Sequence, residues 1–465
     1  MSAGPIPGRL LLRPGHEVAR REPDLLRHLP DGISPATIPA NALLMPPPVN
    51  AHDHGYGIRT LDFGNIDDAL ETWIPGLRLR PRTDPYLEAL VAFSRLAQTG
   101  VGATMHCHNS LNIDRLVDEA GAVMRAADEL GIRLALSCPL LDFDPWAYDG
   151  GPGRLRPFLD PADWKEISAS IPKYAPPMVQ ISAVDAVAAG NTSPLIDVQY
   201  GPIGPQWCSN ALLEGIAEAS AATGRRIHMH LLESPRQRCW LDRRFPQGVV
   251  RYLDDIGFLS PRLAVAHGVQ LRQDELELLA ARGVQLVSNP SANLRLRSGV
   301  APVAAMPANG PAFAFGLDGT GFDDDQDLWR ELRLAHLLHG GRDMTRTFTA
   351  GRVFDAAIHV GAKVLNAPVN EDLVLVDYAA LIADSLTGDL DEAEILLVRM
   401  TAAHAKGLYV GGREIMRDGR LTRVDYEGVR AELLKQARAD LPRLAGERAR
   451  VIKLAAATRA YYSGW

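Results

Sequence analysis

The sequence predicts an α/β fold: a (β/α)8 TIM barrel with a small β-sandwich built from both chain ends. Two observations lead to this prediction. Amphipathic segments with helical periodicity alternate with short apolar runs, and about eight such runs can be counted, the number that closes a barrel. Parallel strands need a crossover helix between them, and the alternation supplies one each time. An open, doubly wound sheet is the structural alternative, because strand counting from sequence is imprecise.

The barrel elements follow one another from residue 46 onward. The predicted strands are an apolar lead-in ending near residue 54 and the runs at residues 102–108, 132–137, 195–200, 226–231, 263–267, 284–287 and 312–317. The predicted helices cover residues 87–98, 113–129, 161–171, 210–222, 249–256, 273–281 and 328–339. A less regular segment, Tyr56 to Thr83, follows the first strand. A long excursion after a strand is more often a functional loop than filler.

The two chain ends contribute the smaller unit. Further strands are predicted at residues 9–13, 41–45, 372–377 and 395–398, with a hairpin over 407–419 that turns at Gly411-Gly412. A charged helix from Tyr426 to Asp440, which Pro442 should interrupt, is expected to serve packing or oligomerisation. We assign residues 1–45 and 367–425 to the two parts of the sandwich, 46–366 to the barrel and 426–465 to a C-terminal helical segment.

The composition restricts the partners. The 465 residues are 46% hydrophobic and 23% charged, which is typical of a globular protein with a full core. The net charge of -7 argues against a nucleic-acid or anionic-membrane partner, since both need a basic face. Neither a membrane span nor a secretory signal is visible, and the four scattered cysteines suit a reducing compartment. We expect a cytoplasmic protein that acts on a small molecule as a homo-oligomer, a dimer or a tetramer.

Side chains that can bind metal or move protons stand where the predicted strands end. They are His52 and His54 after the first strand, His230 and Glu233 after the fifth, His267 after the sixth and Asp318 after the last. In a barrel, the C-terminal strand ends meet at one mouth. A lone histidine is more often a hydrogen-bonded structural residue, but coincidence at four strand ends favours a shared site.

Three imidazoles and a carboxylate, from His52, His54, His230 and Asp318, form a donor set suited to one divalent ion per chain. Zinc is the expected ion, with cobalt, iron or manganese as alternatives. Such a site leaves room for a water whose pKa falls to about 7, so that hydroxide forms at neutral pH. Of the two predicted catalytic residues, Glu233 is placed for proton transfer, and His267 could orient the hydroxide or polarise the substrate.

The order and the local sequences of these motifs resemble those of the amidohydrolase superfamily over nearly the whole chain. The segments that carry the resemblance are Val49–His54, His230-Leu231-Leu232-Glu233, Ala266-His267-Gly268, Asn289–Leu294 and Leu317-Asp318-Gly319. The branch is that of cytosine and guanine deaminases, triazine hydrolases and related urea or carbamate hydrolases. The resemblance implies a discontinuous β-sandwich. It also implies a mononuclear metal site, because the bridging lysine that binuclear relatives carry at the fourth strand has no candidate between Leu195 and Pro205.

Three other histidines have competing interpretations. His106 and His108 repeat the H-x-H spacing at the second strand and are read as pocket lining or core, with a second metal site as the less favoured alternative. His228 shares a face with His230 but lies one layer deeper, which favours a hydrogen-bonded core residue.

The substrate contacts depart from the pattern of the family. Ile203 and Asn289 stand where many relatives have a histidine, and Trp207 adds an apolar surface. These changes favour a neutral, partly apolar substrate. The predicted substrate-binding residues are His108, Asn109, Ile203, Trp207, Asn289 and Arg295. The alternative is that residues such as Asn109, Gln206 or Arg295 replace the missing polar contacts.

Two enzyme hypotheses and one other therefore stand side by side. The first is hydrolysis of a non-peptide C–N or carbamoyl C–S bond in a urea, carbamate, thiocarbamate or amide, by metal-hydroxide attack with Glu233 carrying a proton to the leaving group. The alternative is an aminohydrolase that releases ammonia from a heteroaromatic ring. A barrel that serves only as a binding subunit is disfavoured by the intact ligand set.

Overall fold

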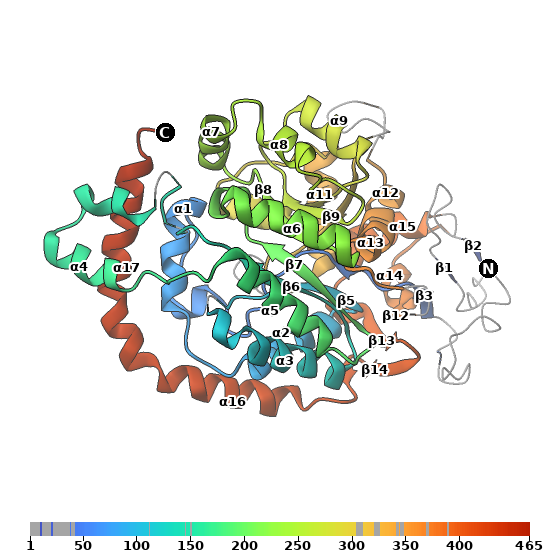
Figure 1. The fold of residues 1–465 in the computed structure, drawn as a ribbon. Helices are drawn as coiled ribbons and strands as arrows, with labels where there is room; N and C mark the ends of the chain where they lie inside the picture. Colours follow the sequence, from blue (N-terminus) through green and yellow to red (C-terminus); the bar gives the residue numbers. More distant parts are fainter. Residues whose placement is uncertain are drawn as a thin grey trace.

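The computed structural model confirms the predicted barrel (Figure 1). It describes residues 10–11, 20–21, 38, 42–110, 112–144, 146–148, 151–303, 310–319, 326–340, 344, 348–368, 372–387 and 390–465. Within these residues, one sheet holds eight parallel strands in sequence order. They are β4 (Val49–Asn50), β5 (Ala103–Cys107), β6 (Arg133–Leu140), β7 (Ile196–Pro202), β8 (Ile227–Leu231), β9 (Leu263–His267), β10 (Gln285–Ser288) and β11 (Ala312–Phe315).

Hydrogen bonds across the seam nearly close this sheet into a barrel. The amide of Ala51 donates to the carbonyl of Phe315 over 2.9 Å, and the amide of Leu317 donates to the carbonyl of His52 over 3.0 Å. The last strand therefore lies beside the segment that follows the first. This closure brings the residues after β11 next to those after β4.

Helices cover the outside of the barrel between the strands. They are α2 (Pro85–Gln98), α3 (Ile113–Leu130), α5 (Pro177–Ala189), α6 (Asn210–Thr223), α7 (Pro235–Arg244), α8 (Val249–Asp255), α9 (Gln273–Ala281), α10 (Pro290–Arg295), α11 (Leu328–His339), α12 (Ala350–Asp355) and α13 (Gly361–Leu365). Helix α4 (Pro161–Ala169) instead projects from the barrel and contacts the C-terminal part of the chain (Figure 1). Several of these helices begin at a side chain that caps the first turn, and α6 is an example. The Ser209 side chain accepts from the amide of Leu212 at the start of α6, and Gly224 ends that helix at φ 72°.

The chain ends meet in one antiparallel sheet. Its strands lie in the order β15 (Arg420–Leu421), β14 (Arg413–Arg417), β13 (Ala405–Val410), β12 (Leu373–Asp377) and β3 (Ala42–Met45). The short strands β1 (Leu10–Leu11) and β2 (Arg20–Arg21) pair with each other, and most of the predicted N-terminal part of the sandwich lies outside the described residues. The pairing of β3 with β12 confirms that both ends build this sheet, while the domain boundaries stay a prediction.

Several elements differ from the sequence prediction. Residues 395–398, predicted as a strand, lie in helix α15 (Glu392–Arg399), where the Asp391 side chain accepts from the first-turn amides of Ala393 and Glu394. A four-residue apolar run does not distinguish a strand from the buried face of a helix, and the cap decided the outcome. Helix α5 was not predicted at all, and helix α14 (Tyr378–Ile382) follows β12.

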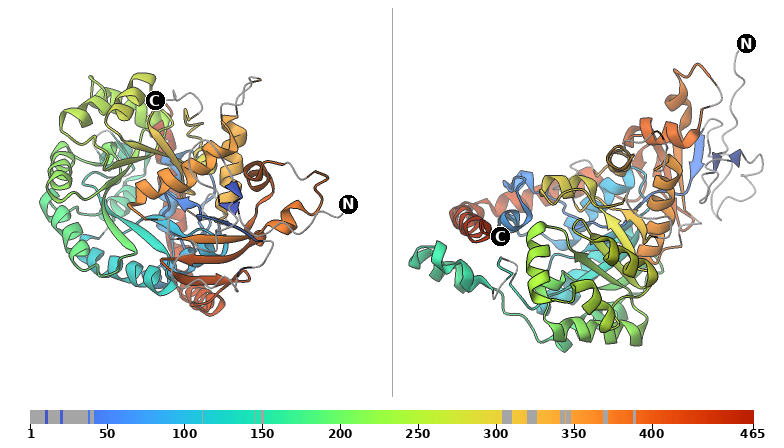
Figure 2. Two further views of the ribbon diagram at one scale, coloured as in Figure 1. Left: turned by 90° about the vertical axis from the view of Figure 1, so that its right-hand side faces the viewer. Right: turned by 90° about the horizontal axis from the view of Figure 1, so that it is seen from above.

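Two C-terminal helices run around the barrel from the antiparallel sheet. α16 (Tyr426–Ala439) passes along α2, and α17 (Leu441–Tyr462) begins with Pro442 in its first turn, where proline is tolerated. Figures 1 and 2 show α17 and α4 at one end of the molecule and the antiparallel sheet at the other. Helix α17 packs against helix α1 (Leu70–Trp73) and the 3-10 helix η4 (Ile74–Leu79), which follow the first strand. Within the described residues, no helix combines the length and apolar character that crossing a membrane requires.

Candidate active site

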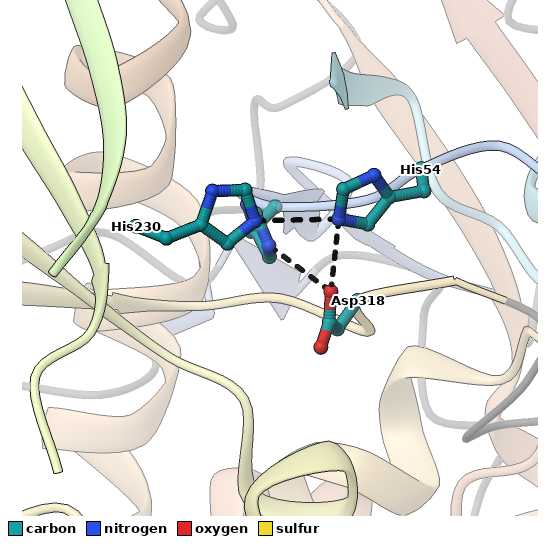
Figure 3. A group of neighbouring side chains, drawn as sticks. His54, His230 and Asp318 are labelled. Atoms are coloured by element: carbon teal, nitrogen blue, oxygen red, sulfur yellow. Dashed lines mark hydrogen bonds and ion pairs between the residues drawn. The ribbon is translucent and has the colours of Figure 1, made fainter. Parts of the chain in front are cut away.

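Four predicted ligand side chains converge at the C-terminal mouth of the barrel. One ligand-type atom from each of His52, His54, His230 and Asp318 lies within 4.8 Å of all the others. Oδ1 of Asp318 lies 3.1 Å from Nε2 of His52 and 3.3 Å from Nε2 of His54. Nε2 of His230 lies 3.3 Å from Nε2 of His54, and Figure 3 shows the side chains of His54, His230 and Asp318 pointing at one space. This donor set and its spacing fit a divalent ion such as zinc.

The histidines of the site are held by hydrogen bonds at their Nδ1 atoms. Nδ1 of His54 donates to Oδ1 of Asn109 over 3.2 Å, and Nδ1 of His230 donates to the carbonyl of Ile203 over 2.8 Å. The Asn109 amide also donates to the carbonyl of His54 over 2.8 Å. Because these Nδ1 atoms carry the hydrogen, the Nε2 lone pairs are directed towards Asp318.

The backbone turns sharply where the strands end. His267 has φ 72° and Asp318 has φ 59°, a left-handed conformation that is uncommon for residues other than glycine. Gly55 also has a positive φ, and a Cβ at this position would lie 2.3 Å from Nδ1 of His106. Asp53 points away from the ligands and accepts from the Asn50 side chain over 2.5 Å. These turns direct the alternate side chains into the mouth.

Burial and charge set the protonation of the centre. Burial lowers the pKa of His52 and His230 well below its usual range, which keeps both imidazoles neutral. Burial alone would raise the pKa of Asp318, but its close contacts with His52 and His54 outweigh that effect and hold the pKa well below its usual range. Burial alone would also lower the pKa of His54, but its contacts with Asp318 outweigh that effect and raise it. The site therefore combines two neutral imidazoles, those of His52 and His230, with an ionised carboxylate, and His54 must lose its proton when a metal binds.

Glu233 and His267 lie on one side of this centre. Nε2 of His267 lies 3.8 Å from Oε2 of Glu233 and 3.9 Å from Oδ2 of Asp318. Burial raises the pKa of Glu233 well above its usual range, and the charges of Asp318 and Glu71 add to this effect. Oε1 of Glu233 has no hydrogen-bond partner within the described residues. The carboxyl group is thus buried, has a raised pKa and keeps one oxygen without a partner among the described residues.

A cavity of about 420 Å³ opens over the centre. Its apolar lining comprises Leu70, Trp73, Ile74, Leu77, Pro139, Leu141, Trp146, Pro172, Ile203, Trp207 and Leu296. Its polar lining comprises His54, Tyr56, Arg78, Arg80, His108, Asn109, Ser170, His230, Glu233, His267 and Asp318. None of the apolar lining residues belongs to the candidate metal centre. They form a wall beside it, so the cavity can accept a substrate with an apolar portion.

The structure brings four of the six predicted substrate-binding residues to this cavity. His108, Asn109, Ile203 and Trp207 line it. Asn289 does not, because it is fully buried behind His267, with its Nδ2 atom 3.3 Å from Nδ1 of that ring.

Arg295 is likewise absent from the described residues that line the cavity. Its Nε atom donates to Oδ2 of Asp67 over 2.7 Å, at the protein surface. The sequence pattern did not predict helix α10, which begins after Asn289 and ends at Arg295. The contacts of these two side chains, with His267 and Asp67, hold them away from the cavity.

The other H-x-H histidines form a separate chain of contacts. Nε2 of His106 lies 3.4 Å from Nδ1 of His108, and Nε2 of His108 lies 3.2 Å from Oε2 of Glu119. Within the described residues, the groups with metal-site spacing include neither His106 nor His108. His106 is a core residue and His108 lines the pocket. A second group with such spacing comprises His52, Cys107 and His228.

Sequence reasoning missed the supports behind the cavity. Asn293, on α10, accepts from Nδ1 of His267 over 2.9 Å. On α17, Tyr462 packs in one cluster with the cavity residues Leu141 and Trp207, and its hydroxyl accepts from the amide of Tyr148 over 3.0 Å. The helical periodicity of residues 441–462 could have predicted α17, but no local signal shows that it packs against this cavity.

A protein-family model matches most of the chain. The model described as "Amidohydrolase family" matches residues 43–384, which span the barrel, the first strand of the antiparallel sheet and all the residues of the candidate centre.

Curated relatives match over most of the chain. The chain is 27% identical to a 5'-deoxyadenosine deaminase of Methanosarcina mazei over 410 residues, which cover 85% of this chain and 86% of the relative. It is 29% identical to a 5-methylthioadenosine/S-adenosylhomocysteine deaminase of Nitratidesulfovibrio vulgaris over 411 residues, which cover 84% of each chain.

Solved structures share the fold. A zinc-bound adenosine deaminase of Xanthomonas campestris superimposes with a TM-score of 0.70 at 21% identity, over 87% of this chain and 86% of that one. A zinc complex of the atrazine chlorohydrolase of Arthrobacter aurescens also has a TM-score of 0.70, at 22% identity over 85% of this chain and 88% of that one.

Proposed function

This chain belongs to the amidohydrolase family, and from that premise we propose that it removes an amino group from a heteroaromatic substrate and releases ammonia. It is a metal-dependent amidohydrolase that acts on carbon–nitrogen bonds other than peptide bonds. The observation that carries the finer proposal is that relatives named as deaminases match along more than four-fifths of the chain. The deaminase alternative is thus better supported than the urea or carbamate hydrolysis that the sequence favoured.

We propose that His52, His54, His230 and Asp318 hold one divalent ion per chain, with zinc as the expected ion. The fit rests on the donor set, on the neutral imidazoles of His52 and His230, and on the Nδ1 hydrogen bonds that leave the Nε2 atoms of His54 and His230 free for coordination. When bound, such an ion lowers the pKa of a coordinated water to about 7 and acts as a Lewis acid.

Glu233 then acts as the general acid–base group. Its unpartnered Oε1 can take a proton from the attacking water and deliver it to the departing nitrogen. Because burial favours the protonated carboxyl, the group is suited to the donating half of this cycle. His267, whose Nδ1 atom donates to Asn293, keeps a lone pair on Nε2 that can accept a hydrogen bond from the water.

The cavity supports a second candidate, hydrolysis of a urea, carbamate, thiocarbamate or amide. Ile203 and Trp207 line it together with Trp73 and Trp146, so much of its wall offers apolar and aromatic surface and no hydrogen-bond acceptor to the polar edge of a nucleobase. An apolar pocket gives only a small preference for a ring with many hydrogen-bonding groups over a less polar substrate of the same size. The side-chain oxygen of Asn109, a polar residue of the lining, already accepts hydrogen bonds from His54 and Tyr56.

Product analysis separates the two candidates. The zinc-loaded enzyme is incubated with aminated purines, pyrimidines and triazines, with adenosine derivatives, and with aryl ureas and carbamates. Ammonia from aminated rings supports the proposed deaminase, whereas an organic amine from ureas or carbamates supports the second candidate. Glu233→Gln is the control, because it should keep its metal and lose most turnover with either class of substrate. The homo-oligomer and the cytoplasmic location stay predictions.

A further inference from the structure

We propose that His228 is a positioning residue for the metal centre. Its side chain accepts the hydrogen bond that fixes the tautomer and the orientation of His52. This inference rests on the proposed function only in that His52 is taken as a metal ligand. His228 lies on β8, two residues before His230 and on the same face of the strand. It touches neither the cavity nor the reacting groups, so its role would be exerted through His52.

The geometry joins the two rings through their nitrogen atoms. Nδ1 of His52 lies 2.8 Å from Nε2 of His228, while Nε2 of His52 lies 3.1 Å from Oδ1 of Asp318. Both histidines are buried, at 0% and 1% exposure, so no solvent water competes for this contact. A nitrogen that binds metal carries no hydrogen. If Nε2 of His52 faces the ion, its Nδ1 must carry the hydrogen and needs an acceptor. Nε2 of His228 is that acceptor.

The other histidines of the centre show why this contact is distinctive. His54, His230 and His267 donate to an amide oxygen or a carbonyl oxygen, which can only accept. His228 can accept at Nε2 only if its own hydrogen sits on Nδ1. That Nδ1 atom has no hydrogen-bond partner within the described residues.

An unpartnered N–H buried in the barrel core costs free energy that an apolar side chain would avoid. The acceptor that His228 offers to His52 accounts for a histidine at this position. The hydrogen bond would make the His52 lone pair point at the ion and would raise its basicity, as outer contacts of ligating histidines do.

The competing explanation is a second metal site. Ligand-type atoms of His52, Cys107 and His228 lie within 4.8 Å of one another, and Sγ of Cys107 lies 3.5 Å from Nδ1 of His52. The two interpretations exclude each other, because Nδ1 of His52 cannot both donate to His228 and bind an ion. The 2.8 Å separation of the two nitrogens is that of a hydrogen bond.

Zinc binding tests the proposal without any substrate. The wild type, His228→Phe, His228→Gln and Cys107→Ala are stripped of metal, and their zinc affinity and stoichiometry are measured by competition with a chelating dye. His339→Phe is the matched control, because His339 is a buried histidine (3% exposed) on α11 whose ring packs against Phe348. Thermal unfolding of the metal-free proteins checks that each variant is folded, and His228→Leu replaces His228→Phe if the latter does not fold.

We expect one zinc ion per chain and a dissociation constant about 10–100-fold weaker in His228→Phe, the range found for outer contacts of metal ligands. His228→Gln, which keeps an acceptor, should lose less, and His339→Phe and Cys107→Ala should bind as the wild type does. Wild-type zinc affinity in both His228→Phe and His228→Leu would overturn this inference and leave the proposed metal centre intact.

Two zinc ions in the wild type, with one lost in both His228→Phe and Cys107→Ala, would replace the inference by the second metal site. A wild type that binds no zinc would instead overturn the proposed metal centre, and the inference with it.

Discussion

Nδ1 of His267 donates a hydrogen bond to Oδ1 of Asn293 over 2.9 Å, and the opposite nitrogen of the ring lies 3.8 Å from Oε2 of Glu233. With Oδ1 of Asn293 as the nearer partner and as an acceptor, Nδ1 carries the hydrogen, and the lone pair of Nε2 points towards Glu233 and Asp318. Because His267 sits in a left-handed backbone conformation (φ 72°), its side-chain direction depends on such outside support.

Replacing Asn293 by leucine should therefore lower kcat by about 10–100-fold without removing metal, since His267 is not a proposed ligand. Asn293→Asp, which keeps an acceptor oxygen, should retain more activity. Steady-state kinetics combined with metal analysis of each variant checks both statements. A normal kcat in Asn293→Leu would show that the orientation of His267 does not limit the reaction.

The proposed metal centre predicts a specific link between zinc and stability. A ligand that binds only the folded state stabilises it by about 2.7 kcal/mol at a concentration 100 times its Kd. Chelation should thus lower the Tm of the wild type, and zinc should restore it. Asp318→Ala should have a Tm that no longer responds to zinc, whereas Asp62→Ala, at an exposed position, should respond as the wild type does. An unaltered zinc response in Asp318→Ala would contradict the ligand assignment.

The parts of the molecule that were predictable from the sequence follow local rules. The barrel comes from the alternation of strand and helix periods, and the convergence of His54, His230 and Asp318 follows once those strands are parallel, because their C-terminal ends share one mouth. Ile203 and Trp207 were predicted at the pocket and do line it.

The unpredicted parts depend on contacts between distant segments or on short, ambiguous patterns. Tyr462 shares an apolar cluster with Trp207 although the two residues are far apart in the sequence, and no periodicity encodes that association. Asn289 shares a motif with the site, yet its side chain packs behind His267, because its direction depends on the turn that enters α10. The apolar run within α15 was too short to distinguish a helix from a strand.

A buried ion pair ties the barrel to the antiparallel sheet. Arg133, on β6, donates from Nε and Nη2 to Asp372 over 2.7 and 2.9 Å, and both side chains are at most 5% exposed. Arg133→Met should destabilise the fold by about 3–5 kcal/mol, because it leaves a buried carboxylate without these two bonds. Changing both residues, Arg133→Met with Asp372→Asn, should restore part of that loss. Urea unfolding measures the differences, and additive losses in the double variant would contradict the coupling.

The C-terminal helix should influence which substrates bind, because Tyr462 supports the apolar wall of the cavity. Its ring lies 5.4 Å from that of Tyr148, which in turn lies 5.9 Å from the cavity residue Trp207. Losing this aromatic packing, worth about 0.5–1.5 kcal/mol per pair, should let the wall relax.

We therefore expect Tyr462→Ala to raise KM by up to about tenfold for substrates with a large apolar group and to change it little for small ones, with kcat less affected. Ile452→Ala, at a 63% exposed position on the same helix, is the matched control and should behave as the wild type does. Equal losses for large and small substrates in Tyr462→Ala would mean that the helix stabilises the fold without shaping the cavity.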